Sequence, residues 1–143
     1  MATLVRLARL AKHLEAGRPG GHAVFDFNVV ALAGDAETPT GHCGSAGCAI
    51  GELPVVWPRY WAFEPVAADG YMPPYLLRGD EFTLPRAVAK WFGIPVADVY
   101  GLFYPGEERW WNPQRLSGTA SAQDVAAGIR QYIAACAAKK AAE

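Results

Sequence analysis

Prolines are concentrated in one segment of this chain and restrict what that segment can form. Five of the eleven prolines fall between Leu53 and Arg78. Proline lacks a backbone N–H and clashes with the preceding turn of a helix, so this segment cannot hold a long helix. We expect either a hairpin, in which YWAFEPV and YMPPYLL flank the turn AADG, or an irregular segment that covers the core.

Apolar residues recur every three or four positions on both sides of this segment, which is typical of amphipathic helices. Gly17 and Gly93 stand where two of these patterns stop, and glycine is favoured just beyond a helix C-terminus. Thr83 is positioned to cap one helix, and Ser121 with Asp124 resembles a capping box for the last one. The sequence therefore predicts helices over residues 3–16, 83–92, 95–103 and 121–136.

Apolar and polar residues alternate in AVFDFNVV, residues 23–30, and predict one half-buried strand. Together with the helices, this pattern indicates an α+β protein that is mainly helical and has a small strand or hairpin component. At 143 residues the chain has the usual size of one domain, so we expect residues 1–143 to form a single compact domain. The alanine-rich end, residues 137–143, is expected to fray.

Charge and hydropathy argue against two classes of partner. The net charge is −1, so no long-range field attracts a phosphate backbone, and we expect no nucleic-acid partner. No apolar run approaches the roughly 20 residues that span a bilayer, and the N-terminus lacks the pattern of a signal peptide. These features predict a cytoplasmic protein with no membrane association.

The stretch GHCGSAGCAIGE, residues 41–52, holds two of the three cysteines and four of the fifteen glycines. Gly44, Gly47 and Gly51 are spaced three and four apart, so on a helix they would form one stripe that lets a neighbour approach closely. Each glycine inside a helix costs about 1 kcal/mol relative to alanine. We therefore expect a helix here that depends on tertiary packing.

Cys43 is the sharpest catalytic candidate in the chain. A thiol just before a helix N-terminus has a lowered pKa, which favours the nucleophilic thiolate. His22 would be its base, with Asp26 to orient the imidazole. The alternative is that Cys43 and Cys48 are small residues packed at a tight turn. Their separation by five positions does not fit the paired spacings of a zinc site, so we expect no metal and no other cofactor.

Large aromatic residues in the proline segment and in the loop 104–118 offer a second kind of site. Trp57, Trp61, Trp110 and Trp111 either cover the core or form an exposed patch, because surface Trp is enriched at interfaces. Trp110 and Trp111 are adjacent, so one regular element can hardly bury both. An exposed patch of this kind would serve a protein partner or a homo-oligomer.

Five short motifs occur in order: FDF at 25–27, CGSAGCAIG at 43–51, WFGI at 91–94, LFYP at 102–105 and DVAAGI at 124–129. In this combination the chain resembles a group of small uncharacterised bacterial and phage-borne proteins with a Cys-Gly-Thr-x-x-Cys-x-x-Gly segment. Here Ser45 stands in place of the usual Thr. The resemblance covers most of the chain from about residue 25 onward and implies a single domain, but it transfers no catalytic residue.

These observations predict a non-enzymatic binding or interaction protein of bacterial or phage origin. The alternative is a small cysteine-dependent enzyme that uses Cys43 with His22.

Overall fold

The computed structural model describes residues 2–20, 24–25, 31–32, 46–65, 73–77 and 83–142. The helical elements in these ranges are α1 (Ala2–Glu15), the 3-10 helix η1 (Ile50–Glu52), α2 (Leu53–Val56), α3 (Leu84–Phe92), α4 (Val96–Phe103) and α5 (Ala122–Ala142). The strands are β1 (Val24–Phe25), β2 (Ala31–Leu32), β3 (Ala46–Gly47), β4 (Trp61–Phe63) and β5 (Pro74–Leu76). The protein is therefore a mainly helical α+β protein, as the sequence predicts.

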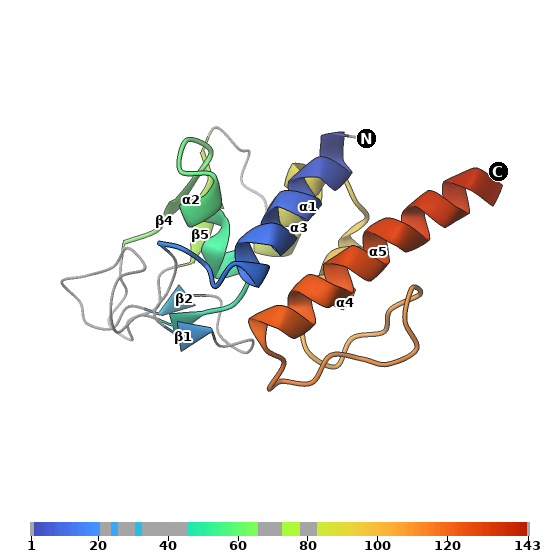
Figure 1. Cartoon of the computed structure of the whole chain (residues 1–143). Helices are drawn as coiled ribbons and strands as arrows, with labels where there is room; N and C mark the ends of the chain where they lie inside the picture. The colour runs from blue at the N-terminus through green and yellow to red at the C-terminus, as the bar shows by residue number, and fades with distance from the viewer. Residues whose placement is uncertain are drawn as a thin grey trace.

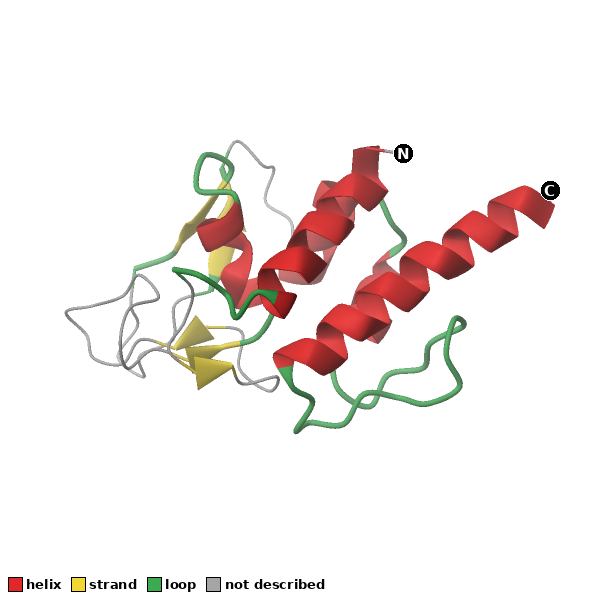
Figure 2. Cartoon of the chain, in the orientation of Figure 1, coloured by secondary structure: helices red, strands yellow, loops and turns green. Residues whose placement is uncertain are grey.

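The long helices occupy one side of the molecule, and the strands occupy the other together with a short helix (Figure 2). Helices α1 and α5 run antiparallel and side by side, with the two chain ends at the same end of the pair (Figure 1). Helix α3 packs on both α1 and α4, and α4 also contacts α5. The strands lie beyond the other end of α1, together with the short helix α2.

The core lies between these helices because each carries an apolar stripe. Helix α1 contributes its fully buried residues Leu7, Leu10, Ala11 and Leu14. Helix α5 faces it with Val125, Ile129 and Tyr132, the residues that the sequence pattern places on its inner stripe. Phe92 of α3 stacks on Phe103 of α4 with ring centroids 5.9 Å apart. The four predicted helices are confirmed.

Trp91 of α3 joins the helical part to the proline segment. Its indole contacts the rings of Trp57, Tyr60 and Trp61 at centroid distances of 5.5, 5.2 and 6.2 Å. From the other side, Arg6 of α1 places its guanidinium carbon 3.7 Å from the centroid of the Trp91 ring and donates a hydrogen bond to the Trp91 carbonyl oxygen at 2.6 Å. Aromatic and cation–π packing therefore holds α1, α3 and β4 together.

The proline segment forms the predicted hairpin. Strands β4 and β5 pair antiparallel, with Ala62 opposite Tyr75 and Phe63 opposite Pro74. Proline is tolerated here because each strand of a two-stranded sheet has one edge that pairs with no other strand of that sheet. Pro54 lies in the first turn of the four-residue helix α2, where its missing N–H removes no helical hydrogen bond.

The predicted helix through Gly44, Gly47 and Gly51 is wrong at Gly47 and begins later than expected in the part of this stretch that the structure describes. Ala46–Gly47 is strand β3, which lies between β1 (parallel) and β2 (antiparallel), and helical structure begins only at Ile50. Repeated glycines destabilise a helix, whereas their backbone freedom suits an extended segment with turns. The predicted strand over residues 23–30 is present at Val24–Phe25, and residues 26–30 lie outside the described residues.

Glu52, at the end of the glycine-cysteine stretch, fixes this region to α1. Its carboxylate is fully buried, with Oε1 2.8 Å from His13 Nε2 and Oε2 3.9 Å from a guanidinium nitrogen of Arg18. A buried carboxylate is tolerated only when partners replace its lost hydration. The pairing therefore anchors η1 to the C-terminal end of α1.

The helix ends follow the sequence signals with one exception. Gly93 adopts a left-handed conformation (φ 65°) after α3, and the capping box of α5 forms: Asp124 N–H donates to Ser121 Oγ at 3.1 Å and Ser121 N–H to Asp124 Oδ2 at 2.9 Å. Thr83 precedes α3 but its side chain makes no capping hydrogen bond. Helix α5 continues to Ala142, since alanine is the best helix former, and the fraying of residues 137–143 stays a prediction.

No helix in the described part of the chain is long and apolar enough to cross a membrane.

The two N-caps allow a matched test of the capping box. We expect Ser121→Ala to lower the free energy of unfolding by about 1 kcal/mol, because the N–H of Asp124 loses its acceptor. Thr83→Ala should cost clearly less, because no side-chain hydrogen bond is lost there. Urea denaturation of both variants measures the difference, and equal costs would contradict the assignment of the capping box.

Candidate functional site

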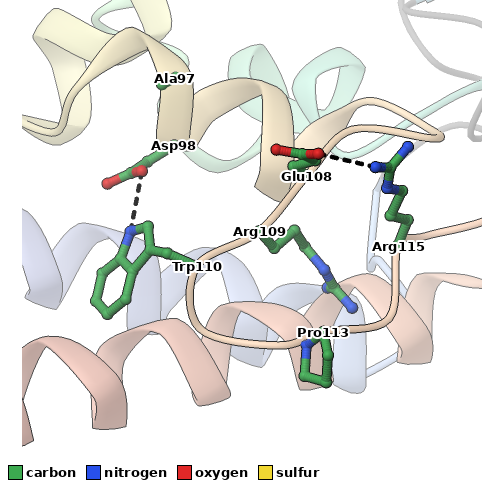
Figure 3. A pocket seen from close by; sticks show the side chains of 7 residues that line it. All are labelled: Ala97, Asp98, Glu108, Arg109, Trp110, Pro113 and Arg115. Carbon is green, nitrogen blue, oxygen red and sulfur yellow. Dashed lines mark hydrogen bonds and ion pairs between the residues drawn. The ribbon is translucent and has the colours of Figure 1, made fainter.

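The loop between α4 and α5, residues 104–121, folds back on both helices and forms an open pocket of about 480 Å³. Figure 3 shows the side chains around it: Ala97 and Asp98 come from the first turn of α4, and Arg109, Trp110 and Arg115 come from the loop. We call it the Trp110 pocket. Of the sequence-predicted binding residues, Trp110 lines this pocket, and the ring of Trp111 packs against that of Trp110.

Asp98 is the buried polar group that organises this pocket. Trp110 Nε1–H donates to its Oδ1 at 3.1 Å, and the Tyr132 hydroxyl of α5 donates to its Oδ2 at 2.6 Å. Asp98 occupies the first turn of α4, where the helix dipole favours a negative charge. One carboxylate thus joins α4, the loop and α5.

Tyr132 serves this network as a hydrogen-bond donor. Burial raises the pKa of its phenol, and the hydrogen bond to Asp98 raises that pKa further. The phenol is therefore neutral at physiological pH. Its ring packs against Trp111 at 4.7 Å and Trp110 at 5.8 Å, so the loop is held by aromatic contacts as well as by the carboxylate.

Trp110 is fixed at its polar edge while its ring reaches the surface. The residue is 51% exposed although its indole N–H is bonded to buried Asp98. Trp111 meets the ring edge to face at 5.7 Å, and Lys139 Nζ of α5 lies 5.0 Å from the ring centroid. The exposed indole is therefore held in one orientation.

Charged groups of both signs surround the indole. Arg109 lies inside the loop (Figure 3), where its Nε donates to the Gln114 carbonyl oxygen at 2.9 Å and burial lowers the pKa of its guanidinium. Arg115 pairs with Glu108 at 2.9 Å, and both side chains are largely exposed. Exposed pairs of this kind contribute little stability, so they can exchange partners readily.

Two glycines, one in α4 and one in α5, explain how the loop comes so close to these helices. A Cβ added to Gly101 of α4 would lie 2.7 Å from the Trp111 ring and 3.1 Å from the Glu108 carbonyl oxygen. A Cβ added to Gly128 of α5 would lie 3.1 Å from Arg109 Nη1. Glycine normally weakens a helix interior, and here it provides the space for the loop.

The structure separates the four predicted binding tryptophans into two pairs. Trp110 and Trp111 form the site described above. Trp57 and Trp61 are buried in the core around Trp91, in agreement with the first of the two alternatives that the sequence leaves open, that these rings cover the core. Burying each of these large apolar rings is favourable by roughly 2–3 kcal/mol. Trp57 follows helix α2, and Trp61 begins strand β4 of the hairpin.

The candidate catalytic residues Cys43, His22 and Asp26 lie outside the described residues. Cys48, the second cysteine of the motif, is buried, and burial raises the pKa of its thiol to about 11. It is therefore a neutral packed side chain near physiological pH. Within the ranges that the structure describes, no three His, Cys, Asp or Glu residues converge to hold a metal ion.

Sequence reasoning missed Asp98, Tyr132 and Arg109 as parts of this site. Tyr132 has the helical spacing of a core residue, and Asp98 reads as an ordinary first-turn acid. The carboxylate and the phenol are 34 positions apart, so no local pattern connects them. Comparisons of the chain with protein-family models, with curated proteins and with solved structures find no match.

The glycine positions provide a test of this packing. Gly101→Ala should lower the free energy of unfolding by roughly 1–3 kcal/mol despite the better helix propensity of alanine, because the Trp111 ring and the loop backbone would have to move. Gly128→Ala should cost less, since the end of the Arg109 side chain can shift. Urea denaturation measures both, and a Gly101→Ala protein as stable as Gly128→Ala would contradict the close approach.

Proposed function

We propose that this chain is a non-enzymatic interaction protein that binds a protein partner, or a second copy of itself, through the Trp110 pocket. The observation that carries the proposal is the exposed indole of Trp110, held in place by its N–H bond to Asp98. An ordered aromatic side chain loses little conformational entropy on binding, so more of its contact energy contributes to affinity.

The neighbours of Trp110 suit a protein interface. Tryptophan and arginine are the residue types most enriched among those that dominate binding energy. Arg109, Arg115 and Glu108 provide a polar rim that carries charges of both signs. A partner with a mixed-charge surface and an apolar recess for the indole would complement this arrangement.

The polar groups of the pocket favour binding over catalysis. Both oxygens of Asp98 already accept hydrogen bonds, and the raised pKa of Tyr132 leaves its phenol protonated. A general base needs a free acceptor with a pKa near the working pH. The thiol-enzyme alternative through Cys43 and His22 stays a prediction, because these residues lie outside the described residues.

The variant Trp110→Ala tests the proposal. Tyr75→Ala is its control, because it removes an aromatic residue of similar exposure from β5. Each protein is immobilised and exposed to a bacterial lysate, captured proteins are quantified by mass spectrometry, and self-association is measured by sedimentation velocity. We expect Trp110→Ala to reduce either the amount of one specifically captured protein or the affinity of self-association by about tenfold or more, as is typical of a residue at the centre of an interface.

Circular dichroism must show that both variants are folded. Capture and self-association that remain unchanged in Trp110→Ala, or that fall equally in Tyr75→Ala, would contradict the proposal.

A further inference from the structure

A second recess of about 220 Å³ lies next to the Trp91 cluster and is lined in part by Trp57 and Tyr60. It is formed by Arg9 of α1 and by the end of α2 with the turn that follows, Val56, Trp57, Pro58, Arg59 and Tyr60. None of these residues belongs to the Trp110 pocket, so the recess is a separate surface. We call it the Arg9–Arg59 recess.

Two arginines border this recess without a counter-charge among the residues that the structure describes. Arg9 and Arg59 are exposed, and neither forms an ion pair with a carboxylate of the described residues, whereas Arg115 pairs with Glu108 and Arg130 pairs with Glu15. The Arg9 guanidinium carbon lies 5.7 Å from the Trp57 ring centroid. The recess thus combines unneutralised guanidinium groups with an apolar and aromatic floor.

The floor of the recess is rigid. Tyr60 is 52% exposed, but its ring packs on Trp91 at 5.2 Å and its carbonyl oxygen accepts the Leu77 N–H at 2.7 Å. The Trp57 ring meets Trp91 edge to face at 5.5 Å, and Arg6 covers Trp91 from α1. A partner would therefore meet an ordered surface and would not have to arrange it.

The volume favours one side chain over a whole small molecule. Cofactor and drug-sized ligands usually occupy pockets of roughly 300–1,000 Å³. A recess of about 220 Å³ suits a single aliphatic or aromatic side chain. Guanidinium groups on its rim match the fork geometry of carboxylates that flank such a side chain.

We propose that the Arg9–Arg59 recess binds an acidic peptide segment of a partner protein, with one apolar side chain in the recess and carboxylates on the two arginines. This inference goes beyond the binding proposed for the Trp110 pocket and does not depend on it, since the two surfaces share no residue.

The test uses fluorescein-labelled nine-residue peptides and fluorescence anisotropy on the full chain. The probe has glutamates around one central leucine; the comparison peptides replace the glutamates by glutamines or the leucine by glycine. We expect the probe to bind about tenfold more tightly than either comparison peptide and to weaken as NaCl rises from about 50 to about 500 mM.

The double variant R9Q/R59Q should weaken probe binding at least about fivefold, the scale expected for two solvent-exposed ion pairs. R115Q is the matched control, because it removes an exposed arginine from the Trp110 pocket, and it should leave the affinity unchanged. A weaker affinity in R115Q but not in R9Q/R59Q would overturn the proposal, because the peptide would then occupy the Trp110 pocket.

Two further outcomes overturn the inference. Equal affinity for the glutamine peptide would show that the arginines do not recognise carboxylates. A single-stranded oligonucleotide of matched charge that binds more tightly than the probe, and loses affinity in R9Q/R59Q, would assign the recess to nucleic acid. Circular dichroism of both arginine variants excludes unfolding as the cause of any loss.

Discussion

The buried carboxylate of Asp98 is the constraint on which the candidate site depends. It accepts hydrogen bonds from Trp110 in the loop and from Tyr132 in α5, and it belongs to α4. If either donor were lost, a desolvated charge would remain partly unpaired, at a cost of about 1–3 kcal/mol. The carboxylate therefore stabilises one arrangement of the two helices and the loop, and that arrangement keeps the Trp110 ring at the surface.

The same principle, a buried charged group with partners from separate elements, recurs at Glu52. There His13 near the end of α1 and Arg18 in the turn that follows hold the short helix η1. Between these two anchors the Trp91 cluster connects α1, α3 and the hairpin. Each of the two proposed binding surfaces presents an exposed aromatic ring that is positioned by contacts with buried residues, next to exposed arginines. Binding by ordered surfaces is the common element of both proposals.

Local signals in the sequence predict most of the fold. Apolar periodicity, Gly93 and the Ser121–Asp124 capping box identify the helices, and the proline segment forms the expected hairpin. Contacts between distant residues could not be predicted. Nothing local distinguishes Trp57, which is buried against Trp91, from Trp110, whose ring is exposed. The glycine spacing at 44–51 has the period of a helical stripe, but the low helix propensity of glycine prevails, and Gly47 lies in a strand.

The hydrogen bond from Trp110 to Asp98 can be observed directly by NMR of the ¹⁵N-labelled indole groups. Trp61, Trp91 and Trp111 have no acceptor for their indole N–H among the described residues, so the bonded signal of Trp110 should stand apart. We predict that this N–H resonates downfield and exchanges slowly, that Asp98→Ala shifts it upfield and accelerates exchange, and that Tyr132→Phe preserves it. A Trp110 indole signal that is unchanged in Asp98→Ala would contradict the account.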